Sequence, residues 1–380
     1  MKHSPTFSRR KVAIVANSAW NIHNFRRNIL QTLLEADCEV VVITPIDSYL
    51  GHLADFPRIR HVALQHLHRK STRIWHEWQL WRELLSIFKS ERPDIVLNYT
   101  IKPNIWGGIA AAQLHIPYIC VVTGLGYSFL HNGWVHFLSK TLYRYAFRKA
   151  AKVVFENIDD RILFNTLGLT TVAQSLSVKG CGINIEHFRP AEKVTEDPFV
   201  FSFIGRFLYD KGIREFVAAA RILRKQHPEI ECWLIGEIDH ENPAALAQSE
   251  LDAWVAEKII VYKGATTDVR PYIAQSACVV LPSYREAIPR TIQEAMAMAC
   301  CAITTDVAGC REAVTDGENG YLVPVRNAEA LAAAMLKLWQ LPTEARAEMG
   351  KKGRQKVEAE FDERLIAAAF RQLIAAVLAV

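Results

Sequence analysis

The sequence contains no apolar run long enough to cross a lipid bilayer. Its most apolar segment lies at residues 365–380 and carries Arg371 near the middle, whereas a spanning helix needs about 20 consecutive apolar residues. Basic residues precede a short apolar run at the N-terminus, as in a signal peptide, but Trp20 and Asn21 follow that run closely. We therefore interpret residues 11–17 as a first β-strand and not as a secretion signal.

Paired metal-binding motifs are also absent. None of the eight cysteines has the Cys-x-x-Cys spacing of a zinc or redox site. Four histidines lie between His61 and His76, but their spacing fits no standard metal site. The sequence therefore predicts reduced thiols in a cytosolic enzyme and no metal site.

Acidic residues are missing over a long stretch, between Asp94 and Glu156. Residues 1–190 hold 23 Lys and Arg against 13 Asp and Glu, whereas residues 191–380 hold 22 against 27. This asymmetry favours an anionic partner for the first half. The alternative is a basic surface that only aids solubility. Because no nucleic-acid-binding motif is present, we predict no nucleic-acid partner.

Short β-rich runs alternate with helical patterns along the whole chain, which predicts an α/β fold with parallel sheets. The chain is also too long for one ordinary core. The expected strands are 11–17, 39–45, 60–65, 94–99, 118–124 and 152–157 in the first half, and 199–205, 231–237, 259–264, 278–283 and 302–307 in the second. Helical patterns lie between them, for example at 25–36, 76–90, 214–226 and 289–300.

The polar, proline-bounded segment 189–198 marks a linker between the two halves. We therefore predict an N-terminal domain at 1–190 and a C-terminal domain at 191–362. Residues 363–380 have helical spacing, and we expect a helix there that packs back towards the N-terminal domain.

Two groups of charged residues follow strands in the second half. Arg206 and Lys211 lie in the loop after strand 199–205, just before a helix, and two cations there suit an anion such as a diphosphate. Glu286 follows strand 278–283, and Glu294 lies inside the helix that Pro289 opens. Carboxylates at these positions suit sugar and ribose hydroxyls, which donate hydrogen bonds. The alternative assigns Arg206, Lys211 and Glu286 to solvated surface and makes Glu294 a partner of the helix dipole.

These runs resemble the retaining family 4 glycosyltransferases, which have the GT-B fold. The resemblance rests on Glu286-x7-Glu294, on Arg206 with Lys211, and on the runs 307–312 and 316–320. In the first half it rests on the runs 17–29, 100–103, 123–129 and 155–160, which resemble a branch that builds capsule, O-antigen and lipid-linked glycans. That branch includes enzymes that extend undecaprenyl-diphosphate-linked bacillosamine.

The resemblance implies two Rossmann-like, doubly wound domains that face each other across a cleft, and a retaining, metal-independent hexosyltransferase. It implies that Arg206 and Lys211 hold the donor diphosphate, Glu294 the ribose, and Glu286 the transferred sugar. The full set of donor-binding residues that it implies comprises Gly205, Arg206, Lys211, Glu286, Ala287, Ile288, Pro289, Arg290 and Glu294. It implies no cofactor beyond the sugar nucleotide, which we expect to be UDP-linked.

The sequence departs from the family pattern at three places. Ala287 and Ala299 stand where relatives usually have glycine, which puts the close approach of backbone to phosphate near Ala287 in doubt. Where many relatives have a histidine near the reacting sugar, this chain has Thr100-Ile101-Lys102, so we place Lys102 there. His23 is a second candidate for this contact, although a lone loop histidine is more often structural.

The acceptor is expected in the first half, as a polyprenyl-diphosphate-linked sugar at the cytoplasmic face of the inner membrane. Lys140, Arg144, Arg148 and Lys152 recur every four residues and predict a basic helical stripe against an anionic bilayer. The residues assigned to acceptor or membrane contact are Asn21, His23, Thr123, Gly124, Gly126, Lys140, Arg144 and Arg148.

Two rival functions remain at this point. Both halves resemble nucleotide-binding folds, as in a nicotinamide-dependent dehydrogenase, but neither has Gly-x-Gly-x-x-Gly after its first strand. The second rival is a catalytically weak, membrane-associated scaffold, which Ala287 and Lys102 permit. A glycosyltransferase with a water-soluble acceptor is a further alternative.

Overall fold

The computed structural model describes residues 7–56, 58–68, 71, 73–125, 134–191, 197–240 and 242–379, with the backbone alone for residues 134–137. The chain divides into two compact units, Met1–Gly182 with Glu363–Val380, and Ile183–Asp362. The boundary at 182/183 lies near the 190/191 expected from the sequence. In the part of the chain that the structure describes, no helix has the length and apolarity to cross a membrane.

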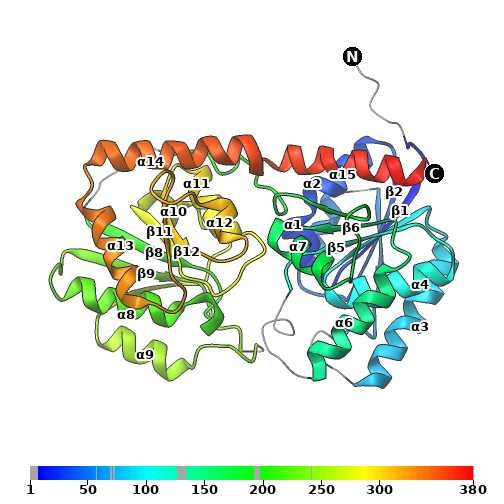
Figure 1. The fold of residues 1–380 in the computed structure, drawn as a ribbon, viewed down its shortest axis with the longest axis horizontal. Helices are drawn as coiled ribbons and strands as arrows, with labels where there is room; N and C mark the ends of the chain where they lie inside the picture. Colours follow the sequence, from blue (N-terminus) through cyan, green and yellow to red (C-terminus); the bar gives the residue numbers. More distant parts are fainter. Residues whose placement is uncertain are drawn as a thin grey trace, which may run out of the picture. The chain divides into compact units, whose positions relative to one another are not determined.

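The first unit is built on a parallel sheet of seven strands in the order β3-β2-β1-β4-β5-β6-β7 (Figure 1). Its strands are β1 (Lys11–Val15), β2 (Glu39–Thr44), β3 (Ile59–Ala63), β4 (Ile95–Tyr99), β5 (Tyr118–Val122), β6 (Lys152–Phe155) and β7 (Ser175–Ser177). Its helical segments are α1 (Ala19–Phe25), α2 (Arg27–Glu35), η1 (Leu50–Asp55), α3 (Ile74–Glu91), η2 (Pro103–Gly107), α4 (Gly108–Gln113), α6 (Trp134–Phe147), α7 (Ile158–Thr166) and α15 (Glu363–Leu378).

The two faces of this sheet bury separate apolar cores. Side chains of α3, α4, α6 and α7 pack on one face, and those of α1, α2 and α15 pack on the other. Strands β4 and β5 are buried along their whole length. This explains their nearly continuous apolar sequence, which is typical of parallel strands covered by helices on both faces.

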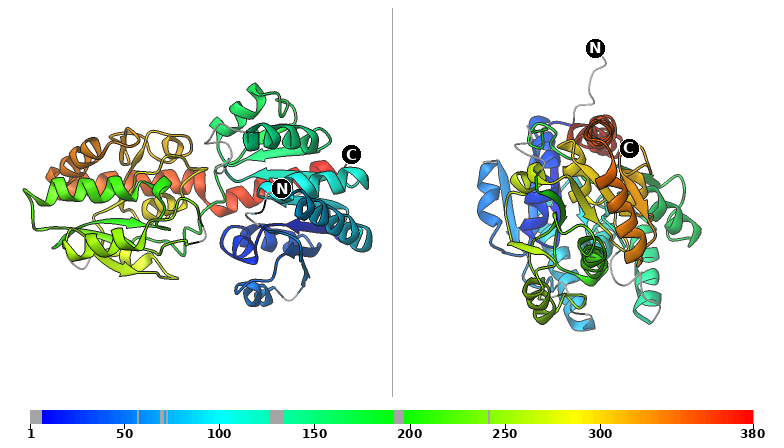
Figure 2. Two further views of the ribbon diagram at one scale, coloured as in Figure 1. Left: turned by 90° about the horizontal axis from the view of Figure 1, so that it is seen from below. Right: turned by 90° about the vertical axis from the view of Figure 1, so that its left-hand side faces the viewer.

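The second unit is also built on a parallel sheet, with six strands in the order β10-β9-β8-β11-β12-β13. Its strands are β8 (Phe199–Ile204), β9 (Ile230–Ile235), β10 (Val261–Gly264), β11 (Cys278–Leu281), β12 (Cys301–Thr305) and β13 (Tyr321–Val323). Its helical segments are η3 (Tyr209–Lys211), α8 (Ile213–Arg224), α9 (Gln248–Ala256), α10 (Arg270–Gln275), α11 (Arg290–Ala297), α12 (Cys310–Ala313), α13 (Ala328–Gln340), α14 (Thr343–Lys356) and η4 (Val357–Phe361). Figure 2 shows helices on both sides of each sheet. Two doubly wound parallel sheets confirm the predicted fold class.

The helix α6 corrects one sequence prediction. It ends at Phe147, and Lys152 is the first residue of β6. The predicted stripe from Lys140 to Lys152 is therefore wrong as one continuous helical face. Arg144 donates to the backbone oxygens of Leu167 and Gly168, while Lys152 donates to that of Ala173. Arg144 thus stabilises the end of α7, and Lys152 stabilises the loop between α7 and β7.

Ala299 adopts a left-handed backbone conformation with φ 56°, one residue beyond Met298, the C-cap of α11. This conformation costs an L-residue about 1–2 kcal/mol, and a glycine pays less. We expect Ala299→Gly to raise the free energy of unfolding of the second unit by about 1 kcal/mol, measured by urea denaturation. Ala295→Gly, inside the same helix, should lower it by a similar amount. Equal destabilisation by both substitutions would contradict this interpretation.

Candidate functional site

The candidate site of the second unit lies where the strand order reverses, between β8 and β11. Ligands of open parallel sheets bind beyond the carboxyl ends of the strands at such a switch point. The loop after β8 contains Gly205, Arg206 and Lys211, and the loop after β11 contains Glu286. The fold thus places both predicted charged loops at the same edge of one sheet.

Backbone contacts hold these two loops together. The backbone N–H of Tyr284 donates to the backbone carbonyl oxygen of Asp210 at 2.8 Å, and the Ser283 hydroxyl donates to the same oxygen at 3.1 Å. Gly212 has φ 73°, and a Cβ there would lie 2.0 Å from the Pro282 oxygen. Only glycine allows this approach, so the sequence Lys211-Gly212 fixes the position of the lysine relative to β11.

Lys211 and Glu286 form an ion pair between the two loops. The Lys211 Nζ lies 2.5 Å from a Glu286 carboxylate oxygen, and the side chains are 25% and 12% exposed. The partly buried ammonium group of Lys211 is therefore paired with the Glu286 carboxylate at the carboxyl edge of the sheet. A diphosphate oxygen bound here would share the ammonium donors, because a lysine has three of them.

A second ion pair connects the first turn of α11 to its interior. The Arg290 Nε donates to Glu294 at 2.8 Å. Glu294 is buried, and burial raises the pKa of its carboxyl group while the Arg290 guanidinium acts against that shift. The four-residue spacing of Arg290 and Glu294 in the sequence is a visible signal for this pair.

Helix α11 begins after Pro289, whose side chain cannot cap the first N–H groups of the helix. Such a helix end carries a partial positive charge and suits a phosphate. The backbone conformation at Ala287 does not require glycine, since Ala287 is not among the residues with positive φ. A Cβ on Gly309 would instead lie 1.9 Å from the Ala287 oxygen. The close backbone approach at this loop therefore needs glycine at position 309, which the sequence did not reveal.

Arg206 is half exposed and donates to Asp239 at 2.7 Å. Asp239 follows β9 and was not identified from the sequence, because no local spacing connects it to Arg206. With this pair, each cation of the candidate donor site has a carboxylate partner. The N-terminus of α11, which Pro289 does not cap, adds a partial positive charge to these paired cations.

The residues assigned to the first unit also follow the carboxyl ends of its strands. Asn21 lies in α1 after β1, Lys102 follows β4, and Thr123 and Gly124 follow β5. Gly126 lies outside the described residues. The structure thus brings these positions to one edge of the first sheet, again around its switch point between β1 and β4.

Lys102 has strong partners in the structure. Its Nζ donates to the Ser71 oxygen at 2.6 Å and forms an ion pair with Glu77, which also accepts from Trp106. Thr100, two residues earlier, has φ 71°, an unusual value for a β-branched residue that is common at functional sites. The catalytic role of Lys102 stays a prediction, and it requires the ammonium group to leave Glu77.

His23 lies on α1 within a cluster of rings. The ring centroids of His52 and Tyr49 are 4.4 and 5.6 Å from that of His23, and Arg27 donates to His23 Nδ1 at 3.2 Å. Asn21 is buried, and its Oδ1 has no hydrogen-bond partner within the described residues. Aromatic rings beside polar groups suit a sugar, so acceptor contact by Asn21 and His23 stays a prediction for this cluster.

Two family models match this chain. "Glycosyl transferases group 1" matches residues 184–356, and "Glycosyl transferase 4-like" matches residues 11–157. The first of these ranges contains β8 to β13 and both charged loops, and the second contains β1 to β6. The chain is a GT-B glycosyltransferase of the group 1, family 4-like class.

Curated relatives of the transferase agree with this family. One is the N,N'-diacetylbacillosaminyl-diphospho-undecaprenol alpha-1,3-N-acetylgalactosaminyltransferase of Campylobacter jejuni, 27% identical over 381 residues, which cover 96% of this chain and 98% of that one. Another is the capsular polysaccharide biosynthesis glycosyltransferase CapM of Staphylococcus aureus, 26% identical over 75% of this chain and 77% of that one.

Solved structures share the fold of the transferase. Sucrose-phosphate synthase from Thermosynechococcus elongatus has a TM-score of 0.81 at 20% identity, over 98% of this chain and 100% of that one. Anabaena Alr3699/HepE, solved with UDP and glucose, has a TM-score of 0.80 at 16% identity, over 97% of this chain and 100% of that one. At these identities the likeness concerns the fold alone.

Proposed function

We propose that this transferase moves a hexose or N-acetylhexosamine from a UDP-sugar to a polyprenyl-diphosphate-linked saccharide, with retention of anomeric configuration. The observation that carries the proposal is the placement of Lys211–Glu286 and Arg290–Glu294 around the uncapped end of α11. The Campylobacter relative, which matches along nearly its whole length, is named for transfer to a diphospho-undecaprenol-linked sugar. UDP is also the nucleotide in the Anabaena structure.

The chemistry of this site is stabilisation of a departing diphosphate. Lys211, Arg206 and the first N–H groups of α11 neutralise the charge that develops as the sugar becomes cationic. Glu294 and Glu286 accept hydrogen bonds from hydroxyls of the ribose and the sugar. We assign no carboxylate nucleophile. In this mechanism the acceptor attacks the face that the diphosphate leaves, and a phosphate oxygen takes the acceptor proton.

With such an acceptor, the reaction takes place at the cytoplasmic face of the inner membrane. Its product contributes to a bacterial surface polysaccharide or to the glycan of a glycoprotein. The basic first half of the chain supports peripheral contact with anionic lipid. The two alternatives to be separated from this proposal are transfer to a water-soluble acceptor and a catalytically weak scaffold.

A donor screen followed by a transfer assay tests the proposal. UDP-, GDP- and dTDP-sugars are compared by thermal shift, since a ligand at about a hundredfold over its Kd adds roughly 2.7 kcal/mol to the stability of the folded state. The stabilising donor is then incubated with a polyprenyl-diphosphate saccharide, and the new linkage is analysed by NMR. Inverted anomeric configuration, transfer only to free sugars, or no turnover with any donor would each reject one part of the proposal.

We expect turnover to survive removal of divalent metal ions. Among the described residues, no three His, Cys, Asp or Glu side chains gather into a group that could hold a metal ion. Lys211, Arg206 and the α11 N-terminus supply the positive charge that a metal supplies elsewhere. The measurement is the rate after EDTA treatment, with and without added magnesium or manganese. Loss of activity that either metal restores would contradict this prediction.

A further inference from the structure

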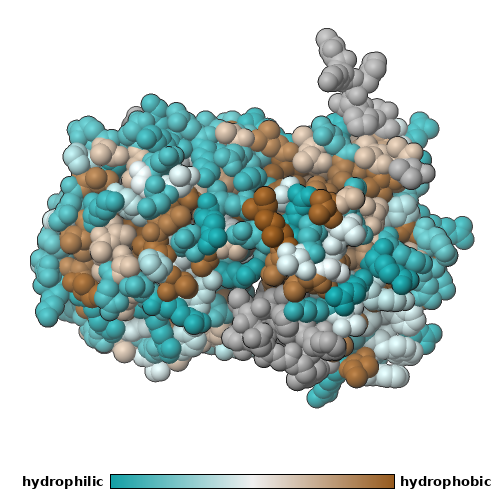
Figure 3. All heavy atoms as spheres, in the orientation of Figure 1, coloured by the Kyte–Doolittle hydropathy of each residue, from teal (hydrophilic) through white to brown (hydrophobic). Residues whose placement is uncertain are grey.

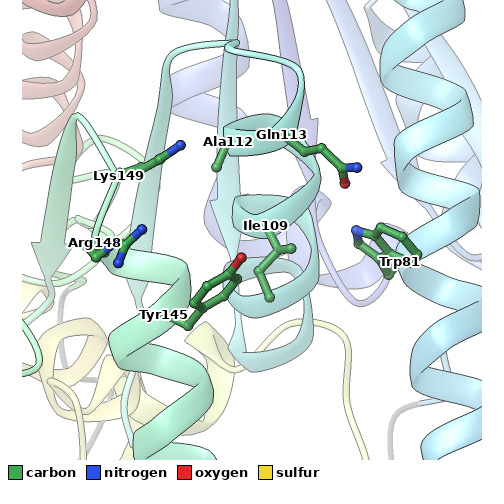
Figure 4. A pocket seen from close by; sticks show the side chains of 7 residues that line it. All are labelled: Trp81, Ile109, Ala112, Gln113, Tyr145, Arg148 and Lys149. Carbon is green, nitrogen blue, oxygen red and sulfur yellow. The ribbon is translucent and has the colours of Figure 1, made fainter.

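The outer surface of the first unit carries a pocket of about 450 Å³ between α3, α4 and α6. Figure 4 shows Trp81 of α3 on one side of the pocket, Ile109 of α4 in the middle, and Tyr145 and Arg148 on the other side. Lys149 completes that side. The pocket therefore combines aromatic and aliphatic walls with two cations, and it is separate from the strand edge that holds the predicted acceptor residues.

The cations of the pocket are available to a ligand. Arg148 and Lys149 are exposed, and within the described residues neither side chain has an ion-pair partner. Arg144, one turn before Arg148, differs because it donates to backbone oxygens at the end of α7. No acidic residue lines the pocket, and none occurs between Asp94 and Glu156 in the sequence. Two cations in a pocket without an acidic lining residue favour an anion.

The Trp81 indole adds a hydrogen-bond donor to the same pocket. Its Nε1 is buried and has no acceptor among the residues that the structure describes. Buried indole N–H groups usually have a partner, so an unpaired donor on the wall opposite Tyr145 and Arg148 indicates the place of a ligand oxygen. The side chains of Arg148, Lys149 and Trp81 thus line one pocket with hydrogen-bond donors that have no acceptor among the described residues.

Helix α3 continues this surface with exposed apolar side chains. Ile74, Trp75 and Trp78 are 84%, 63% and 38% exposed. The rings of Trp75 and Trp78 stack at 4.7 Å, and the Arg82 guanidinium lies 4.9 Å from the centre of the Trp78 ring. Tryptophan next to arginine is typical of proteins at the interface of a bilayer. On the face of the molecule that Figure 3 presents, hydrophobic residues are interspersed with hydrophilic ones.

The acidic residues of α3 have internal partners. Glu77 pairs with Lys102 and Trp106, and Glu83 accepts from the N–H groups of Gln65 and His66. Glu91, the remaining one, is buried next to Arg60. The carboxylates of this helix are thereby held inside the unit, so the tryptophans and Arg82 determine the character of its outer face.

We propose that the pocket between α3, α4 and α6 binds the phosphate of an anionic phospholipid headgroup within a bilayer. Arg148 and Lys149 contact the phosphate oxygens from one side of the pocket, and the Trp81 N–H donates to a headgroup oxygen from the other side. Ile74, Trp75 and Trp78 lie in the interfacial layer. This inference rests on the proposed membrane location and adds to it a specific lipid site. It also replaces the membrane contact predicted for the stripe from Lys140 to Lys152 with a contact through α3, α4 and the end of α6.

Vesicle flotation at low salt, without nucleotide or acceptor, tests the inference. The wild-type protein should float with phosphatidylcholine vesicles that contain phosphatidylglycerol, and not with phosphatidylcholine alone. Arg148→Ala combined with Lys149→Ala should weaken this partition about thirtyfold, since each basic residue near an anionic surface contributes a factor of about five. Trp81→Phe keeps a ring and removes the N–H, and it should weaken binding roughly fivefold.

Lys351→Ala combined with Lys352→Ala on α14 is the matched control, because it removes the same charge from the second unit. Equal losses in this control and in the pocket variant would overturn the inference, as would wild-type flotation of the pocket variant with an unchanged circular dichroism spectrum. Calorimetry with inorganic phosphate and glycerol phosphate separates the sources: free phosphate that binds as tightly as vesicles would also overturn it. Flotation without any sugar transfer would reject the proposed function and support the lipid site. Sugar transfer without flotation would support the proposed function and overturn the lipid site.

Discussion

Lys211→Ala is expected to lower kcat/KM for the sugar nucleotide about a hundredfold. A charge-assisted hydrogen bond contributes on the order of 1.5–3 kcal/mol, and each 1.4 kcal/mol corresponds to a factor of about ten in rate. The substitution also leaves the Glu286 carboxylate, 12% exposed, without its partner. An unpaired negative charge at the site repels the diphosphate, so the loss should exceed that of one hydrogen bond.

Arg206→Ala should have a smaller effect, of roughly tenfold, because Arg206 is half exposed and already bound to Asp239. Steady-state kinetics with the donor identified by the screen give both values. Arg221→Ala on α8 is the matched control, since Arg221 forms an exposed pair with Glu257 and contacts no residue of the site. Unchanged kinetics in both site variants would remove the donor assignment from this edge of the sheet.

The sequence predicted most of both sheets, because buried parallel strands are continuous apolar runs. It missed β7 and β13, which are three residues long. At that length the apolar pattern is no longer than that of an ordinary loop, and only the neighbouring strand identifies the segment as part of the sheet. The end of α6 was missed for a related reason, since Arg148 and Lys152 continue its spacing beyond the last helical residue.

The sequence also placed the charged loops, but it could not assign their partners. Lys211 and Glu286 are 75 positions apart, and they meet because β8 and β11 are neighbours in the sheet. Asp239 reaches Arg206 in the same way, through the pairing of β8 with β9. The glycines gave only a partial signal: Gly309 lies in the run 307–312 that carries the family resemblance, but its close approach to Ala287 is a backbone contact that no local pattern shows.

The runs 17–29 and 155–160, which the family resemblance identified separately, meet through one buried ion pair. An Arg26 guanidinium nitrogen lies 2.9 Å from a Glu156 carboxylate oxygen, and the side chains are 4% and 9% exposed. The guanidinium also lies 4.4 Å from the centre of the Tyr99 ring. Burial alone would lower the pKa of the Arg26 guanidinium, but its neighbours, Glu156 first among them, raise that pKa above its usual range. This pair joins α1 and α2 to the carboxyl ends of β4 and β6.

Arg26→Ala is therefore expected to destabilise the first unit by about 3–5 kcal/mol, because it leaves a buried carboxylate without a counter-charge. Arg26→Leu combined with Glu156→Leu removes both charges and should cost less than either single alanine substitution. Hydrogen exchange of peptides from β4 and β6 measures the loss within this unit. Arg10→Ala is the control: it removes an exposed pair with Asp94 and should cost less than 1 kcal/mol. If Arg26→Ala costs no more than Arg10→Ala, or if the losses at Arg26 and Glu156 simply add, the pair does not hold the two runs together.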